Sequence, residues 1–101
     1  ECVVNDIPFF AKGANIIPPD FFPARALNFE DRLIDDAIEA NMNMLRIWGG
    51  GIYPSQSFLD KCDERGLVIW QDFMFACGMV RGDSAHQTNV KLEAIDQLKK
   101  M

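Results

Sequence analysis

No apolar run in this sequence is long enough to cross a membrane. The longest, residues 73–80, has eight residues including a glycine, whereas a spanning helix needs about 20. The chain also lacks the basic start and the extended apolar stretch of a signal peptide. It opens with Glu1 and not with methionine, so we expect a piece of a longer polypeptide. A membrane is not expected among its partners.

Cysteine and histidine are too few and too scattered for a disulfide framework or a zinc site. The three cysteines, Cys2, Cys62 and Cys77, have no C-x-x-C spacing, and His86 is the one histidine. We therefore predict buried, reduced thiols and no metal ligands. Reduced thiols favour a reducing, cytoplasmic compartment, although the sequence leaves a lysosomal or secreted parent open.

The chain has no block of basic residues. Its 10 lysines and arginines against 15 acidic residues leave a net charge of −5, which argues against nucleic acid and anionic membranes as partners. With 49% hydrophobic and 25% charged residues, the composition is that of a globular protein. At 101 residues the chain is one domain at most.

Hydrophobic patterns divide the chain into three units, each a strand followed by a helix. In the first unit, a turn at residues 5–6 leads into a strand over 7–12, which ends at 13–15. A loop with several prolines follows, because proline interrupts a helix. Apolar residues at helical spacing then predict a helix over 29–40, with Asn28 as its N-cap.

The second and third units follow the same order. A strand over 44–48 leads through a glycine loop to a helix over 55–65, which stops at Gly66. A strand over 67–71 leads through a long loop to a helix that starts near residue 85. Strands that alternate with helices and consist almost entirely of apolar residues indicate an α/β fold with a parallel sheet covered by helices.

The start and the buried side of the last helix can also be predicted. Ser84 with Gln87 three residues later has the form of a capping box. Leu92, Ile95 and Leu98 lie at helical spacing, so we expect them to form a buried stripe.

Large and charged side chains stand at the ends of the second and third strands, where α/β proteins hold ligands. Because side chains alternate along a strand, Arg46 and Trp48 share one face, and Trp70 and Asp72 share one face of the next strand. An indole suits the C–H surface of a sugar ring, Asp72 can accept hydrogen bonds from hydroxyls, and Arg46 can pair with a carboxylate. The alternative is that both tryptophans are core residues and Arg46 forms a structural ion pair.

The three glycines at 49–51 lack the Lys-Ser/Thr of a phosphate loop and the spacing of a dinucleotide fingerprint. We expect them to let the backbone pass close to a ligand or a neighbouring strand.

Neighbouring carboxylates at 35–36 and 63–64 lie on predicted helices and point different ways. Only Asp72 and Asp20 therefore stand where chemistry is expected, and a single carboxylate does not make a two-carboxylate hydrolase.

Three motifs together resemble the β-mannosidases of glycoside hydrolase family 2. They are Lys-Gly-Ala-Asn at 12–15, Ala-Asn-Met-Asn-Met-Leu-Arg-Ile-Trp-Gly-Gly-Gly-Ile-Tyr at 40–53, and Trp-Gln-Asp-Phe-Met-Phe-Ala-Cys at 70–77. The resemblance covers nearly the whole chain. It implies that residues 1–101 are the N-terminal part of a catalytic TIM barrel: the first three βα units of a (β/α)8 fold, with parallel strands and covering helices, completed by the remainder of the parent barrel.

For function, the resemblance implies part of a retaining exo-β-mannosidase, which hydrolyses terminal β-linked mannose from oligosaccharides without a cofactor. One glutamate of such an enzyme attacks the anomeric carbon and a second protonates the leaving oxygen. In the family these glutamates follow the fourth and seventh strands, which lie outside this chain. The resemblance therefore assigns no catalytic residue here.

The resemblance does assign the wall of a sugar site. Trp48 matches the tryptophan that lines the subsite for the terminal mannose, and Arg46 matches an arginine beneath the nucleophile. The implied substrate-binding residues are Trp48, Asp72 and Asn15, and the implied supporting residues are Arg46, Gly49 and Gly50.

The sequence departs from the family pattern on the leaving-group side of the pocket. Ile16 stands where an aromatic residue is usual, Pro54 stands where an acidic residue is usual, and residues 79–82 replace a stretch that usually includes Tyr-Pro. Two alternatives stay open at this point. One is a non-catalytic sugar-binding or assembly module from a truncated barrel, and the other is a related family 2 hydrolase of the β-galactosidase or exo-glucosaminidase type.

Overall fold

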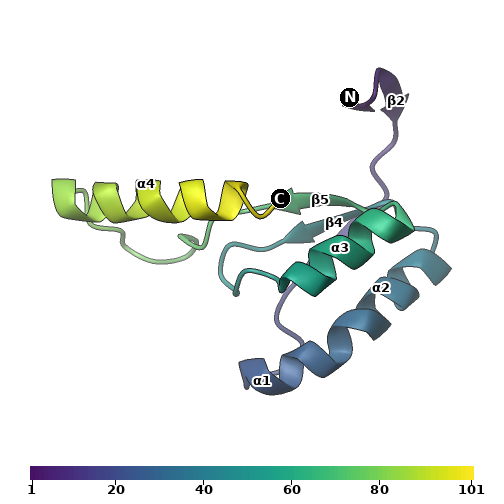
Figure 1. Ribbon diagram of the computed structural model, residues 1–101, viewed down its shortest axis with the longest axis horizontal. Coiled ribbons are helices and arrows are strands. Elements are labelled where there is room, and N and C mark those ends of the chain that lie inside the picture. Colours follow the sequence, from purple (N-terminus) through teal and green to yellow (C-terminus); the bar gives the residue numbers. More distant parts are fainter.

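A three-stranded parallel sheet lies at the centre of the computed structural model, which describes residues 1–101 except for the side chain of Asn28 (Figure 1). Its strands are β3 (Gly13–Ile16), β4 (Met44–Ile47) and β5 (Val68–Gln71), in that spatial order. Both pairings, β3 with β4 and β4 with β5, are parallel. The predicted α/β class with a parallel sheet is therefore confirmed.

Two helices, α2 (Glu30–Glu39) and α3 (Gln56–Arg65), pack on one face of this sheet (Figure 1). Alternation along β4 turns Leu45 and Ile47 into the core, while Arg46 between them is only half-buried. The core lies between the sheet and the two helices. Its buried residues are Ile34, Ala37, Leu45, Ile47, Phe58, Cys62 and Leu67.

Local capping signals set the ends of these helices. Ser55 is the N-cap of α3 and accepts a hydrogen bond from the Phe58 amide at 3.1 Å. Gly66 ends the same helix with a φ of 72°, as its sequence position predicts. Helix α2 has Phe29 in the N-cap position. The predicted cap at Asn28 concerns the one side chain outside the described part of the chain.

The predicted first strand is wrong in position. Residues 7–12 do not enter the parallel sheet; instead β1 (Cys2–Val4) and β2 (Ile7–Phe9) form a separate antiparallel hairpin, set apart from the sheet in Figure 1. The parallel strand begins at Gly13, where a Cβ would lie 1.7 Å from the carbonyl oxygen of Met44. Because this strand is short and half of it is glycine and alanine, hydrophobic periodicity did not detect it.

The turns around this strand agree better with the sequence. The predicted turn is confirmed, with positive φ angles of 50° at Asn5 and 63° at Asp6. The proline-containing loop holds a short helix α1 (Pro23–Ala26) and a 3₁₀ turn η1 (Leu27–Phe29), which we did not predict. Pro23 occupies the first helical position, where a missing N–H costs no intrahelical bond.

The buried stripe predicted for the last helix is wrong. Helix α4 (Ser84–Leu98) has no buried residue, and Leu92, Ile95 and Leu98 are all exposed. In Figure 1 this helix extends away from α2 and α3. Helical periodicity predicts an apolar stripe but not which surface lies against it.

The predicted cap of this helix is displaced by one residue. Asp83 is the N-cap, and its carboxylate accepts a hydrogen bond from the His86 amide at 2.9 Å. Asp83 and Ser84 are both good caps, so the sequence alone does not separate them.

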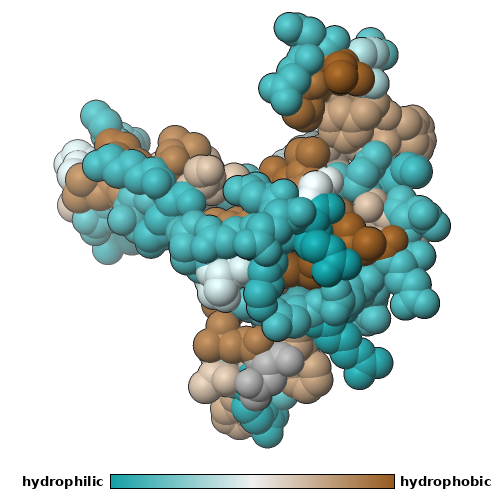
Figure 2. Space-filling view, turned by 45° about the vertical axis from the view of Figure 1, so that its right-hand side comes forward, coloured by the Kyte–Doolittle hydropathy of each residue, from teal (hydrophilic) through white to brown (hydrophobic). Residues whose placement is uncertain are grey.

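Apolar side chains reach the surface at the N-terminal hairpin, around α1 and along α4 (Figure 2). The large exposed ones include Phe10, Phe21, Phe22, Leu92 and Leu98. These side chains do not belong to the buried core, which lies between the sheet and helices α2 and α3. None of the helices in the described residues is long and apolar enough to pass through a bilayer.

The prediction of buried thiols holds for one cysteine of three. All three are free, but only Cys62 is buried, whereas Cys2 is partly exposed and Cys77 is exposed. Burial raises the pKa of the Cys62 thiol from 9.0 to about 11, with smaller contributions from Asp63 and Glu30. Because the folded-state pKa is raised, the stability contributed by this neutral thiol is present below about pH 9 and is lost as the pH rises towards 11.

Alkylation distinguishes the buried environment of Cys62 from the exposed environment of Cys77. At pH 8, iodoacetamide should modify Cys77 and leave Cys62 unmodified in the folded chain, because the thiolate is the reacting species and Cys62 is both buried and protonated. Peptide mass spectrometry measures the outcome, and the urea-unfolded chain, in which both thiols should react, is the control. Rapid native alkylation of Cys62 would contradict the described core.

Core packing leads to a second prediction. Phe58 is 2% exposed, whereas Phe21 is fully exposed. Phe58→Ala should lower the free energy of unfolding by about 3–5 kcal/mol, and Phe21→Ala should change it by less than about 0.5 kcal/mol. Urea titration followed by circular dichroism measures both. Equal effects of the two substitutions would show that the helices do not pack on the sheet as described.

Candidate functional site

A bidentate salt bridge joins the second strand of the sheet to the residue that follows the third. Arg46, in β4, donates from Nε to Asp72 Oδ1 at 3.2 Å and from Nη2 to Asp72 Oδ2 at 2.6 Å. Asp72 is the residue directly after β5. The side chains are 37% and 20% exposed, respectively. Two parallel bonds in a half-buried setting hold the carboxylate in one orientation.

The register of the sheet sets the neighbours of this pair. Asn15, Arg46 and Trp70 are opposite one another on the three strands, and therefore share the face turned away from α2 and α3. Arg46 Nη1 donates to Asn15 Oδ1 at 3.2 Å. The guanidinium also lies over the Trp70 ring, 5.6 Å from its centroid. One arginine thus contacts a side chain on each neighbouring strand.

Gly49 brings the backbone into the same cluster. Its amide donates to Asp72 Oδ2 at 3.2 Å, and its carbonyl accepts from the Ala76 amide at 3.2 Å. A Cβ at this position would lie 2.6 Å from the carbonyl oxygen of Phe73. The glycine is therefore needed for the close approach of the loops after β4 and β5, as expected for this stretch.

Trp48 lies in a neighbouring groove and not in the hydrogen-bonded cluster. A Cβ at position 50 would come within 2.2 Å of the Trp48 ring, so Gly50 leaves room for the indole. The groove has a volume of about 500 Å³, and Trp48 forms part of its wall. Its other lining residues, from the loops after β3 and β4 and the start of α1, are Ile17, Pro18, Pro19, Asp20, Phe21, Pro23, Gly50, Gly51 and Ile52.

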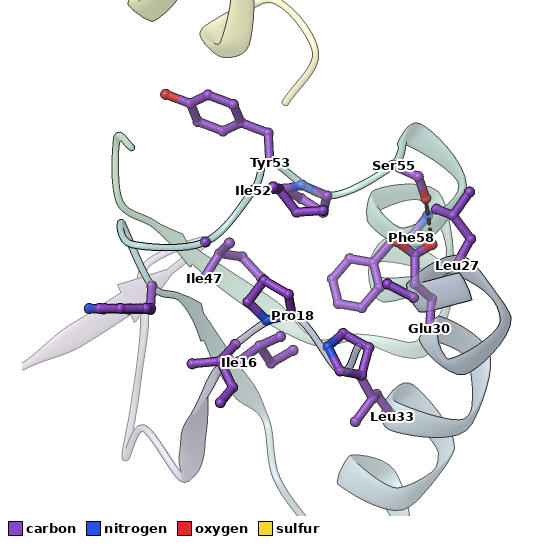
Figure 3. A pocket seen from close by; sticks show the side chains of 16 residues that line it. Ile16, Pro18, Leu27, Glu30, Leu33, Ile47, Ile52, Tyr53, Ser55 and Phe58 are labelled. Carbon is purple, nitrogen blue, oxygen red and sulfur yellow. Dashed lines mark hydrogen bonds between the residues drawn. The ribbon is translucent and has the colours of Figure 1, made fainter. Parts of the chain in front are cut away.

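An apolar cavity of about 170 Å³ adjoins this groove and is shown in Figure 3. Pro18, Ile52 and Phe58 are among its lining residues, and Trp48 lines both spaces. The dashed line in Figure 3 joins the Ser55 hydroxyl to the Glu30 carboxylate, at 2.6 Å. Glu30, the carboxylate among the described residues of this wall, is therefore engaged in tying α3 to α2.

Asp20, the other carboxylate considered in the sequence, is also engaged. It accepts hydrogen bonds from Arg25 Nη2 at 2.7 Å and from the Phe22 amide at 2.8 Å. The Arg25 guanidinium, and to a lesser degree the Phe22 amide, hold the pKa of Asp20 below its usual value. These bonds fix the loop before α1, which is a structural role.

The predicted site residues thus fall into two groups. Asn15, Arg46, Gly49 and Asp72 are joined by direct hydrogen bonds, whereas Trp48 and Gly50 border the adjacent groove. Among the described residues, no group of three His, Cys, Asp or Glu side chains is arranged to hold a metal ion. The open face offers a fixed carboxylate, an amide and an indole, which suits a polar ligand with apolar faces.

Sequence reasoning missed one polar residue of this region, Tyr53. Its hydroxyl accepts a hydrogen bond from the Met74 amide at 3.2 Å and donates to Glu93 Oε1 at 2.5 Å. These partners lie 21 and 40 residues away in the chain. No local pattern could therefore have indicated them.

Comparisons with known proteins agree with the resemblance in the sequence. No protein-family model matches this chain. It is 43% identical to the β-mannosidase of Capra hircus and 42% identical to that of Bos taurus, each over 99 residues that make up 97% of this chain and 11% of the relative. β-Mannosidase A of Aspergillus terreus is 40% identical over the same share of both chains.

A solved structure is similar in fold as well as sequence. The crystal structure of the β-D-mannosidase from Dictyoglomus thermophilum matches with a TM-score of 0.82 and 49% identity, over 89% of this chain and 11% of that one. The chain is therefore a homologue of β-mannosidases over nearly its whole length. It spans about 11% of the length of these relatives.

The strength of the central ion pair can be measured by double-mutant cycles. The coupling energy between Arg46 and Asp72 should be about 1–2 kcal/mol, because two charge-assisted bonds form in a half-buried setting. Arg65 and Asp35 form a matched pair, with one bond of 3.0 Å between largely exposed side chains, and should give less than about 0.5 kcal/mol. Equal coupling energies in the two cycles would contradict the bidentate geometry of the Arg46–Asp72 salt bridge.

Proposed function

We propose that this chain is part of a retaining exo-β-mannosidase and supplies the wall of its sugar site. One observation carries the proposal: in a homologue of β-mannosidases, Arg46 fixes Asp72 at the carboxyl end of a parallel strand. The carboxyl ends of parallel strands are where α/β enzymes bind their substrates. The proposal extends to the parent protein, of which the chain would form a small part.

The sheet would form the first three βα units of a (β/α)8 barrel of glycoside hydrolase family 2. In such a barrel, helices cover the outside and the other face of the sheet is the interior. Here α2 and α3 lie on the core side, so Asn15, Arg46 and Trp70 would face the interior. Asp72 and Gly49 would then lie at the catalytic mouth.

Asp72 would keep one acceptor site for a substrate. A carboxylate has about four lone-pair sites. Three are filled, by Arg46 Nε, Arg46 Nη2 and the Gly49 amide. The remaining site, on Oδ1, can accept one sugar hydroxyl. Its direction is fixed before binding, which lowers the cost of orienting the sugar.

Trp48 would provide the apolar side of the same subsite. Its indole lines the groove beside the cluster, and a flat aromatic face packs against the C–H surface of a pyranose ring. Gly50 beneath the ring leaves the indole room in this position. Orientation of the mannose would therefore combine an apolar contact with a hydroxyl contact.

The chemical step would be performed by residues outside this chain. A retaining glycosidase uses two carboxyl groups about 5–5.5 Å apart, one as nucleophile and one as acid and then base. Asp72 is committed to Arg46, and we assign it to binding and not to attack on the anomeric carbon. The 101-residue chain alone should therefore be inactive.

A panel of aryl β-glycosides tests this proposal on the full-length protein that carries the segment. Aryl β-mannoside should be hydrolysed with a kcat/KM at least about 100-fold above those of the β-galactoside and β-glucosaminide.

Asp72→Asn should lower kcat/KM for the mannoside by about 10- to 100-fold, since a lost charged hydrogen bond is worth about 1.5–3 kcal/mol. Stopped absorbance assays of aryl alcohol release measure both.

The control is Asp96→Asn on α4, which changes a carboxylate that accepts from Lys100 Nζ at 2.7 Å and from Gln97 Nε2 at 3.2 Å and should leave kcat/KM unchanged. A preference for galactoside or glucosaminide would replace the mannosidase assignment with one of the related hydrolases. Turnover by the isolated 101-residue chain would contradict the placement of the catalytic glutamates elsewhere.

A further inference from the structure

Tyr53 joins three segments that are far apart in the sequence. It lies in the loop between β4 and α3, and its hydroxyl accepts from the Met74 amide at 3.2 Å and donates to Glu93 Oε1 at 2.5 Å. In Figure 3 its ring points away from the cavity, towards the helix drawn in yellow. The hydroxyl is therefore engaged in holding protein segments together and does not face the apolar space.

The bond to Met74 acts on the segment that carries Asp72. This segment is fixed at its start by the Asp72 amide, which donates to the Ile47 carbonyl at 3.1 Å. It is fixed again by the Ala76 amide, which donates to the Gly49 carbonyl at 3.2 Å. Met74 lies midway between these two anchors. Without Tyr53, the Met74 amide would lose its acceptor, and the packing of Met74 against the core would have to hold the segment between the two anchors.

Glu93 sets the direction of the Tyr53 hydroxyl. A phenol can rotate its proton, but donation to Glu93 leaves a lone pair for the Met74 amide. Desolvation, and then the hydrogen bond to Glu93, raise the pKa of Tyr53, so that the phenol stays neutral and keeps its proton. Helix α4 buries no residue, and this bond ties it to the loop between β4 and α3.

We infer that Tyr53 is a positioning residue for the site. By holding the Met74 amide, it fixes the segment that presents Asp72 to Arg46 and to the sugar, and Glu93 orients its hydroxyl for that task. The kinetic consequence rests on the proposed glycosidase function. The structural consequence, a fixed segment after β5, does not.

Kinetics of the full-length protein test the first consequence. Tyr53→Phe should lower kcat/KM for aryl β-mannoside about 10-fold, mainly through a higher KM, since a small displacement of a binding group weakens substrate orientation. Glu93→Ala should have a similar effect, and the double variant should show no further loss, because both changes break one unit. Glu93→Gln keeps an acceptor oxygen and should retain activity. Asp96→Asn, on the same helix, is the matched control.

Hydrogen exchange of the same proteins tests the second consequence without any substrate. The peptide that contains residues 72–76 should exchange several-fold faster in Tyr53→Phe and in Glu93→Ala than in the wild type. It should be unchanged in Glu93→Gln and in Asp96→Asn. Mass spectrometry of peptic fragments gives the rates.

Unchanged exchange in Tyr53→Phe would overturn the inference, as would independent, multiplicative losses in the double variant or an equal loss in Glu93→Gln and Glu93→Ala. If the wild-type protein hydrolyses no glycoside, the proposed function fails. The exchange rates then decide the positioning role of Tyr53 alone.

Discussion

The ion pair between Arg46 and Asp72 is the interaction on which the candidate site depends. It joins the open face of β4 to the residue that follows β5, and it involves two parallel hydrogen bonds. Charged groups in a half-buried setting are stabilised only when their partners are well placed. Asn15, the Gly49 amide and the Trp70 ring provide those partners. Each of them comes from a different segment, so the pair also fixes how the segments meet.

The two faces of the sheet have different roles: one packs against the helices, and the other carries the polar cluster. Leu45 and Ile47 face the helices and belong to the core, whereas Arg46 between them faces the other way. Glycine permits the two closest backbone contacts: Gly13 lies against Met44 in the first parallel strand, and Gly49 lies against the loop after β5. A short parallel sheet can hold a polar cluster in this way because the helical side supplies the apolar burial.

The sequence predicts those parts of the fold whose signals are local. Helix α3, with its Ser55 cap and Gly66 stop, and the strands β4 and β5 follow from apolar spacing and turn chemistry. The strand that begins at Gly13 was missed because its place depends on close contact with Met44. The apolar stripe of α4 was predicted, but burial depends on a partner surface that no periodicity describes. Alternation predicted one face for Arg46 and Trp48 and one face for Trp70 and Asp72; the structure joins Arg46 to Asp72 and Trp70 and places Trp48 in the adjacent groove. The contacts of Tyr53 span 21 and 40 residues and depend on tertiary structure.

The measurement that bears most directly on this account is a crystal structure of the full-length protein with a bound mannose-derived inhibitor. One hydroxyl of the sugar should donate to Asp72 Oδ1, the pyranose ring should pack on Trp48, and Arg46 should keep both bonds to Asp72. Two glutamates from later strands should flank the anomeric carbon. A sugar bound away from Trp48 and Asp72, or an Asp72 released from Arg46, would contradict the central claim.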